Sequence, residues 1–273
     1  MDERAIGIFD SGLGGLCALR EALNILPGEN IVYFGDSGRV PYGSRSYDII
    51  QKYAHQAMNF LISKNVKIVL VACGTVASVA IDYLKESFPH IPIIGVVEAA
   101  CEKALEIAKA KQNKNIGVIG TEATITKGAY KKRIFELDES CKVYGKACPL
   151  FVPLVECGHL DGDEITKLAA EFYLSEFKHL NLSSLVLGCT HYPFIKNTIG
   201  DIVNTELIDV SLEAVHRLKN ELEIRNMTNN SGKKEAPDIY VSDDEVQGFS
   251  RIASNFLGYD ISADVKKIDI EKY

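Results

Sequence analysis

The sequence predicts an α/β fold made of two similar lobes, each a mostly parallel sheet flanked by helices. Short apolar runs alternate with amphipathic segments along the chain, a pattern typical of parallel strands joined by crossover helices. Most of the runs are continuously apolar rather than alternating, as strands buried on both faces of a sheet are. The pattern also starts again halfway along the chain, which indicates the second lobe.

The elements can be assigned in chain order from these runs. Eight β-rich runs are expected as strands, at residues 5–10, 31–36, 68–73, 91–97, 115–121, 184–190, 206–210 and 238–244. Amphipathic segments between them predict helices, among them residues 46–64, 97–110, 163–179 and 211–225. The uneven spacing of the strands argues against a closed eight-stranded barrel. Residues 226–238, NMTNNSGKKEAPD, form the one clearly linker-like stretch.

Two similar stretches suggest an internal repeat. Gly7, in IGIFDSG, stands about as far before Cys73 as Gly117, in IGVIGTE, stands before Cys189. Each half therefore opens with a glycine-containing strand and reaches a cysteine at a strand end after a similar length of chain. We interpret this repeat as two α/β lobes that face one another.

Composition and charge exclude several classes of protein. The 273 residues are 47% hydrophobic, enough for two hydrophobic cores. The net charge is −7 and the basic residues are scattered, so neither nucleic acid nor a membrane surface is an expected partner. The chain shows no export signal and no uninterrupted membrane-length apolar run. Seven cysteines without a C-x-x-C pair disfavour a disulfide framework and a structural zinc site, so we expect a cytoplasmic protein.

Polar and small residues follow the predicted strands, where ligands of open parallel sheets bind. In the first half they are Asp10, Ser11, Asp36, Ser37, Pro41, Tyr42, Gly43, Ser44, Cys73, Gly74 and Thr75. In the second half they are Thr121, Thr124, Cys189, Thr190 and His191. The sequence therefore predicts a ligand site where the carboxyl ends of the two sheets meet.

Cys73 and Cys189 occupy equivalent places, each at a strand end with a helix expected directly after it. Such a setting is expected to lower a thiol pKa through the helix N-terminus. A single cysteine there would more often be an inert core residue, but two in matching places point to paired chemistry. A Cys-His-Asp acyl-transfer triad would leave one cysteine idle. Two acid/base groups acting on opposite faces of one carbon would perform racemisation.

The chain resembles the cofactor-independent glutamate racemases of the aspartate/glutamate racemase superfamily. The motifs that carry the resemblance run through nearly the whole chain: IGIFDSGLGGL, YFGDSGRVPYG, VACGT, GVIGTEATI, CPLFVPLVE, VLGCTHYP and IYVSDD. The resemblance implies interconversion of L- and D-glutamate for peptidoglycan synthesis, without pyridoxal phosphate or metal. It also implies a homodimer and two pseudo-symmetric domains with the active site between them. We place these at residues 1–97 plus 207–273, and at residues 98–206.

The resemblance also assigns roles to individual residues. It makes Cys73 and Cys189 the catalytic acid/base pair, with Asp10 near the first thiol and Glu156 and His191 near the second. The residues matched to substrate contacts are Asp10, Ser11, Tyr42, Gly43, Gly74, Thr75, Thr121, Thr124, Thr190 and His191. From local sequence alone, Asp10 and Ser11 could equally be turn and cap residues, Glu156 a solvated charge and His191 a core residue.

One departure from the family pattern concerns the substrate. The family pattern at the first cysteine is C-N-T, whereas this chain has C-G-T, so the amide expected to bind the substrate is absent at Gly74. We therefore expect weakened glutamate binding, with Gly74→Asn lowering KM. A racemase of the same superfamily acting on aspartate or another amino acid stays open as the alternative.

A nucleotide-binding module is a further, weaker alternative. It rests on GLGGLC at residues 12–17, which lacks the third glycine of the dinucleotide fingerprint because Cys17 stands there.

Overall fold

The computed structural model describes residues 2–229, 231, 236–243, 246–262 and 264–273. Its strands are β1 (Ile6–Asp10), β2 (Ile31–Gly35), β3 (Ile68–Val71), β4 (Ile93–Gly95), β5 (Asn115–Gly120), β6 (Lys142–Ala147), β7 (Ser184–Leu187), β8 (Glu206–Asp209), β9 (Asp238–Val241) and β10 (Val265–Lys267). They form a six-stranded sheet in the order β10-β9-β2-β1-β3-β4 and a four-stranded sheet in the order β6-β5-β7-β8. All described pairings are parallel, which confirms the predicted fold class.

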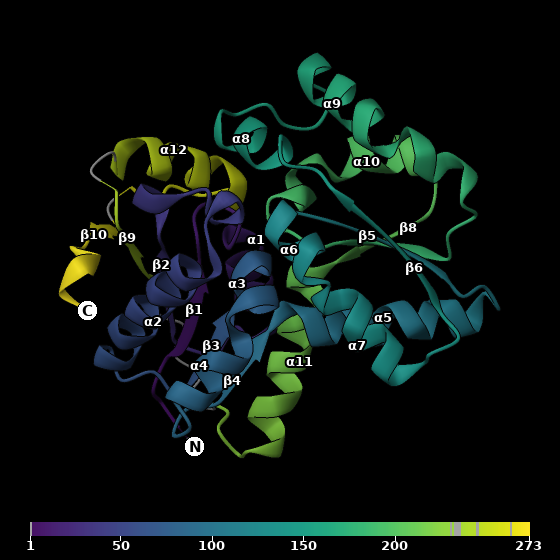
Figure 1. Cartoon of the computed structure of the whole chain (residues 1–273). Helices are drawn as coiled ribbons and strands as arrows, with labels where there is room; N and C mark the ends of the chain where they lie inside the picture. The colour runs from purple at the N-terminus through teal and green to yellow at the C-terminus, as the bar shows by residue number, and fades with distance from the viewer. Residues whose placement is uncertain (1, 230, 232–235, 244–245, 263) are drawn as a thin grey trace.

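Helices surround both sheets (Figure 1). Their bounds are α1 (Leu16–Ile25), α2 (Tyr47–Ser63), α3 (Gly74–Val79), α4 (Ile81–Ser87), α5 (Val96–Ala110), α6 (Glu122–Lys127), α7 (Ala129–Leu137), α8 (Phe151–Glu156), α9 (Glu164–Leu174), α10 (Lys196–Val203), α11 (Val210–Ile224) and α12 (Val246–Leu257). Short 3-10 helices lie at Ser37–Arg39, Tyr42–Ser44, Ser175–His179, Tyr192–Ile195 and Ile270–Lys272. Of the helices in the described ranges, none is long and apolar enough to cross a membrane.

The six-stranded sheet with its helices is here called the first lobe, and the four-stranded sheet with its helices the second lobe. The chain passes from the first lobe to the second through α5, which follows β4, and returns through α11, which follows β8. These two helices pack against each other at the junction of the lobes (Figure 1). Arg217 on α11 also forms ion pairs with Glu98 and Glu102 on α5, at 3.4 and 2.8 Å. The lobes are therefore joined at their base by a packed helix pair.

The predicted strands are all present, most of them shorter than expected. Residues 91–97 contain only the three-residue β4, because Val96 and Val97 already belong to the buried first turn of α5. Two strands were not predicted, β6 and β10, and both lie at sheet edges. Their sequences, KVYGKA and VKK, are half-exposed and rich in lysine, so they lack the continuous apolar signal of a central strand.

Both predicted domain boundaries fall inside secondary-structure elements. The boundary after residue 97 falls inside α5, and the one after residue 206 falls inside β8. β8 pairs with β7 along its whole length and therefore belongs to the second sheet. If the domains are divided by sheet, the boundary lies after β8 and not after residue 206. The division into two domains stays a prediction. Parts of the expected linker, residues 230 and 232–235, and the end of the strand expected at 238–244, lie outside the described residues.

Candidate active site

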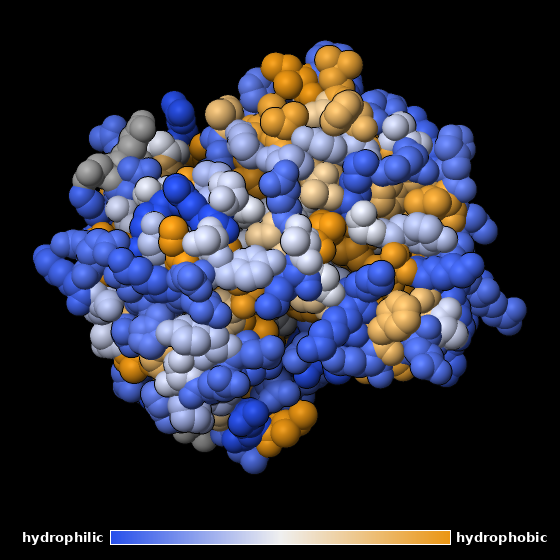
Figure 2. Space-filling model, in the orientation of Figure 1, coloured by the Kyte–Doolittle hydropathy of each residue, from blue (hydrophilic) through white to orange (hydrophobic). Residues whose placement is uncertain are grey.

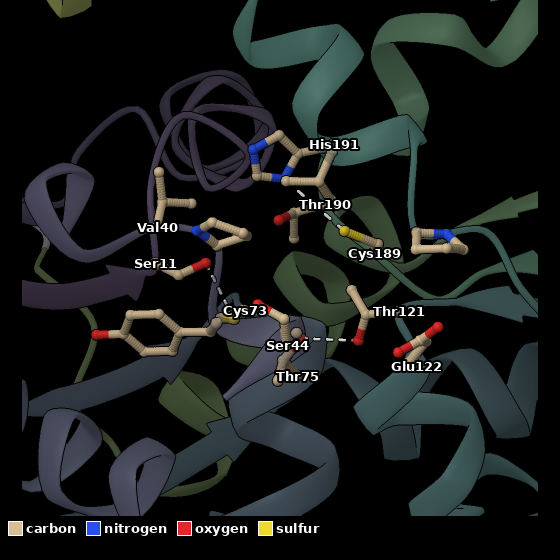
Figure 3. Close-up of a pocket in the computed structure, with 15 residues that line it drawn as sticks. Ser11, Val40, Ser44, Cys73, Thr75, Thr121, Glu122, Cys189, Thr190 and His191 are labelled. Carbon is tan, nitrogen blue, oxygen red and sulfur yellow. Dashed lines mark hydrogen bonds between the residues drawn. The ribbon is translucent and has the colours of Figure 1, made fainter. Parts of the chain in front are cut away.

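A pocket of about 70 Å³ lies between the lobes, where the carboxyl ends of the two sheets meet (Figure 3). First-lobe side chains come from the segments after β1, β2 and β3, and second-lobe side chains from those after β5, β6 and β7. Nine of the predicted site residues line it: Ser11, Tyr42, Gly43, Cys73, Thr75, Thr121, Cys189, Thr190 and His191. Figure 3 shows Cys73 on the first-lobe side and Cys189 on the second-lobe side.

Cys73 follows β3 and directly precedes α3. Its thiol is buried and donates a hydrogen bond to Ser11 Oγ at 3.4 Å. Burial, together with the nearby Asp10 carboxylate, raises the pKa of this thiol to about 12, against the hydrogen bonds to Ser11 and to the backbone of Val76. The sequence expectation of a lowered pKa is therefore wrong for Cys73. Loss of water around the sulfur outweighs the N-terminus of a helix only six residues long.

Cys189 lies two residues after β7, and its sulfur faces His191. The distance from Cys189 Sγ to His191 Nδ1 is 3.8 Å, and His191 Nε2 lies 2.5 Å from Glu156 Oε1. Burial lowers the pKa of the His191 imidazole, but the hydrogen bonds to Cys189 and Glu156 raise it, and the net result lies well above the usual value. A protonated imidazole carries hydrogen on both nitrogens, so His191 can donate to the sulfur and to the carboxylate together.

Asp10 lies behind the pocket and joins the lobes. Its buried carboxylate accepts hydrogen bonds from the Gly12 amide at 2.9 Å and from the Thr190 hydroxyl of the second lobe at 3.1 Å. Burial raises the pKa of Asp10, while the charge of His191 and these hydrogen bonds lower it. Asp10 does not line the pocket itself. Its contacts therefore position the strand end that carries Ser11 and the turn that carries Thr190.

The segment that carries Tyr42 and Gly43 is held by a buried carboxylate. Asp36 accepts a hydrogen bond from the Tyr42 hydroxyl, another from Arg39 Nε at 2.7 Å and a third from Ser242 Oγ at 2.6 Å. Tyr42 is itself buried, and its ring packs against that of Tyr53 with 5.4 Å between centroids. This anchoring brings Gly43 close to the second lobe, where a Cβ on Gly43 would lie 2.7 Å from Thr121 Cβ.

Threonines from both lobes line the pocket beside this segment. Thr75 Oγ1 of the first lobe lies 3.0 Å from Thr121 Oγ1 of the second (Figure 3). Thr121 caps α6, since its hydroxyl accepts from the Thr124 amide at 3.3 Å, and it also lies 3.0 Å from Thr124 Oγ1. Thr124 is fully buried behind Thr121 and does not line the pocket. Its hydroxyl therefore orients Thr121 from behind.

Gly74 is not among the lining residues either. The position of a Cβ there is occupied by the carbonyl oxygen of Gly188, in the second lobe. A backbone oxygen cannot rotate aside as a side chain can, so an asparagine at this position has no room in the present arrangement. The expectation that Gly74→Asn would simply add a missing contact to the substrate does not fit this geometry.

Pro41 and Ser44, which the sequence places after the second strand, also line the pocket. Four further lining residues were not predicted: Val40, Glu122, Pro149 and Val152. All are adjacent in sequence to predicted residues or lie in the CPLFVPLVE motif, which was the available signal. The GLGGLC turn faces the second lobe, because a Cβ on Gly14 would overlap the Thr190 hydroxyl and lie 2.6 Å from His191 Nδ1. These side chains cover the turn where a dinucleotide would need to approach.

The described residues contain no group of three His, Cys, Asp or Glu side chains arranged to hold a metal ion. The requirement for no cofactor stays a prediction. The groups at the pocket that can exchange protons or hold a charged substrate are the two thiols, the imidazole, the Glu122 carboxylate and the hydroxyls.

Comparisons with known proteins identify the family. The family model described as Asp/Glu/Hydantoin racemase matches residues 18–218. A glutamate racemase of Chlorobaculum tepidum is 43% identical over 258 residues, which cover 94% of this chain and 93% of that protein. The crystal structure of glutamate racemase from Francisella tularensis in complex with D-glutamate superposes with a TM-score of 0.91 at 37% identity, covering 100% of both chains. This chain belongs to the Asp/Glu/Hydantoin racemase family.

Proposed function

We propose that this protein is a glutamate racemase that interconverts L- and D-glutamate with two cysteines and no cofactor. The observation that carries the mechanism is the pair of strand-end thiols, Cys73 and Cys189, which reach one pocket from opposite lobes. The substrate follows from relatives such as the Chlorobaculum tepidum and Francisella tularensis enzymes, both named glutamate racemase. The enzyme is accordingly an isomerase, and its D-glutamate would serve peptidoglycan synthesis in the cytoplasm.

The two thiols differ in their surroundings, which suggests different resting roles. Because its pKa is about 12, Cys73 holds its proton at neutral pH and is ready to donate it. The sulfur of Cys189 lies 3.8 Å from Nδ1 of His191, whose raised pKa favours the protonated ring, so that Nδ1 can donate a hydrogen bond to the sulfur. We therefore assign Cys189 as the base and Cys73 as the acid in one direction, with the roles exchanged in the other.

The reaction requires one bond to break and one to form at the α-carbon. The basic sulfur takes the α-hydrogen as a proton, and the electron pair of the C–H bond stays on the carbon. The opposite thiol then delivers its proton to the other face, so that its sulfur becomes the thiolate. Backbone amides and the hydroxyls of Ser11, Thr75, Thr121 and Thr190 can hold the substrate carboxylates during this exchange. Exclusion of water from the pocket strengthens these interactions.

Replacing each thiol tests the mechanism. Cys73→Ser and Cys189→Ser are each expected to lower kcat for racemisation by orders of magnitude, because a hydroxyl is a far weaker acid than a thiol. Each variant should still eliminate HX from a β-substituted analogue of one hand only. Wild-type rates in either variant would refute the two-thiol mechanism. A panel of L-amino acids in D₂O, followed by optical inversion, tests the substrate, and faster turnover of aspartate or another amino acid would favour the alternative racemase.

We also propose that the protein forms a homodimer through α9. Ile165, Leu168 and Phe172 lie on one face of this helix and are all more than half exposed, and Figure 2 shows an apolar patch over it. Apolar patches on a surface commonly mark association sites. Charged residues border this face: Lys167 pairs with Glu164 at 3.0 Å, and Lys178 with Glu171 at 2.9 Å.

Light scattering tests this interface. The wild type is expected at twice the chain mass of 30.1 kDa, and Phe172→Glu at the mass of one chain. Ile224→Glu is the matched control, because Ile224 is 75% exposed and Phe172 76%, but Ile224 lies on α11. A dimer that persists in Phe172→Glu would place the interface elsewhere, and a monomeric wild type would reject the dimer.

A further inference from the structure

The two segments that carry the catalytic thiols touch each other through their backbones. Gly74 follows Cys73 and begins α3, and Gly188 precedes Cys189. The carbonyl oxygen of Gly188 occupies the space that a Cβ on Gly74 would need, and its carbonyl carbon would lie 3.2 Å from that Cβ. The Cα of Cys189 would lie 3.5 Å from it. Any side chain at position 74 would therefore press directly on the neighbour of the second thiol.

This contact belongs to a set of close approaches between the lobes around the pocket. A Cβ on Gly14 would overlap Thr190, and one on Gly43 would lie 2.7 Å from Thr121. The neighbour of Gly74 is backbone, and that of Gly43 is Thr121 Cβ, which is fixed to the backbone, whereas the neighbours of Gly14 are the ends of side chains. A side-chain neighbour can change rotamer, whereas a backbone neighbour moves only with its segment. Gly74 thus lets the two thiol-bearing segments approach more closely than a residue with a side chain would.

We propose that Gly74 is a positioning residue that sets the separation of Cys73 and Cys189 by allowing backbone contact between the lobes. This proposal rests on the two-thiol function proposed above. A methyl group at position 74 would push the segment of Gly188 and Cys189 away from α3. An error of about 1 Å in the placement of reacting groups can cost about a hundredfold in rate, so even this small group is expected to impair proton delivery across the pocket.

The separation of the thiols decides the fate of the carbanion. After one sulfur has taken the α-proton, the carbanion is protonated either by the opposite thiol, which inverts it, or by the same thiol, which returns the original enantiomer. If the first thiol exchanges its proton with D₂O before returning it, the substrate gains deuterium without inversion. If the lobes move apart, the opposite thiol delivers its proton to the carbanion more slowly. The first thiol also becomes more accessible to solvent. A wider separation therefore raises exchange with retention relative to inversion.

The experiment compares Gly74→Ala with the wild type, using protiated L-glutamate in D₂O. Initial rates of deuterated L-glutamate and deuterated D-glutamate formation are measured by mass spectrometry after chiral separation. Gly74→Ala is expected to lower kcat for inversion about a hundredfold, to change KM by less than about threefold, and to raise the ratio of retained to inverted deuterated glutamate. Gly74→Asn is expected to do the same. Gly145→Ala, on β6, is the control, because its Cβ would meet only Ile125 at 3.5 and 3.7 Å.

The outcomes separate this proposal from the function on which it rests. A wild type that does not racemise glutamate, or full activity in Cys73→Ser, rejects the function. An active wild type with an unchanged isotope ratio in Gly74→Ala rejects only the positioning role, as does a Gly74→Asn variant with improved kcat/KM. If Gly74→Ala does not fold, Gly43→Ala decides the question, since its methyl group would lie 2.7 Å from Thr121 Cβ, an atom that no rotamer change can move, in the same lobe interface. An unchanged isotope ratio there counts against the proposal.

Discussion

Cys73 shows how burial decides the chemistry of a single side chain. Its sulfur lies at a helix N-terminus, a setting that favours the thiolate, yet its pKa rises to about 12. α3 has six residues and so a weak dipole, while desolvation and the neighbouring Asp10 carboxylate act in the opposite direction. The thiol therefore holds its proton at neutral pH, as the proposed role of proton donor requires.

The first prediction is that alkylation of Cys73 by iodoacetamide keeps accelerating with pH. Only the thiolate reacts, and with a pKa of about 12 its fraction should rise about tenfold per pH unit from pH 8 to pH 10. The rate is followed by mass spectrometry of the peptide that contains Cys73. A short unstructured peptide with one cysteine serves as the control, since its rate levels off above a pKa of about 8.5. A Cys73 rate that levels off by pH 9 would contradict the raised pKa.

The second prediction concerns Glu156, which lies 2.5 Å from His191. If His191 acts in its protonated form, activity falls as pH rises through its pKa, and Glu156 helps to keep that pKa raised. Glu156→Gln removes the charge, lowers the His191 pKa, and should move the alkaline limb of kcat/KM to lower pH. At neutral pH the loss should be about tenfold, as for a hydrogen bond to a charged group. The measurement is the pH profile of both enzymes.

Glu164→Gln is the control for the pH profile, since Glu164 is an exposed carboxylate on α9. An alkaline limb that stays in place in Glu156→Gln would show that the protonation of His191 does not limit the rate.

At the scale of elements, a series of polar contacts connects the pocket with the last residues of the protein. Tyr42 lines the pocket and donates to Asp36, which Arg39 also holds. Arg39 in turn donates to Glu271 Oε1 at 2.9 Å and to Gln56 Oε1 at 2.6 Å. Its guanidinium also lies 3.9 Å from the centre of the Tyr53 ring. The segment after β2 is thus tied to α2 and to the C-terminal 3-10 helix.

The third prediction compares the loss of Arg39 with the loss of the Glu271 charge in this series of contacts. Arg39→Leu leaves the fully buried Asp36 without its cation, which should lower the free energy of unfolding by about 3 kcal/mol and raise KM by loosening Tyr42. Glu271→Gln should cost less than about 1 kcal/mol, because the Glu271 side chain is 58% exposed and solvent screens its charge. Urea denaturation measures both. If Glu271→Gln costs as much as Arg39→Leu, the C-terminal segment rather than Asp36 anchors Arg39.

At the scale of the whole molecule, the active site exists only because the two lobes meet. Cys73 and Cys189 belong to opposite halves of the sequence and reach one pocket. Asp10 with Thr190, and Thr75 with Thr121, hold the lobes together around it. At the opposite end, α5 and α11 pack against each other. The molecule thus needs both halves for either thiol to have a counterpart.

The fourth prediction is that the whole enzyme needs no added cofactor, because the two thiols supply both proton-transfer groups. Extended dialysis against EDTA and hydroxylamine should leave the racemisation rate intact, whereas complete alkylation of the thiols should abolish it. A loss of activity after dialysis that a metal ion or pyridoxal phosphate restores would overturn the prediction.

Much of the fold could be predicted because its local signals are strong. Buried parallel strands such as β3 and β7 are continuous apolar runs, and the residues directly after them have to be small or polar where a ligand enters. Cys73, Thr75, Cys189 and Thr190, which were predicted from this pattern, line one pocket. The edge strands β6 and β10 escaped prediction, since half-exposed, lysine-rich strands resemble loops in sequence.

The sequence by itself determined the α/β alternation, the strand-end positions of Cys73 and Cys189, and the family, because each is written in short runs of adjacent residues. Only the tertiary structure decided that β8 joins the second sheet, that Cys73 holds its proton, and that Gly74 meets the Gly188 carbonyl. Pairing, desolvation and steric fit depend on residues that are distant in sequence and adjacent in space. A local sequence pattern therefore does not predict which residues will be neighbours in space.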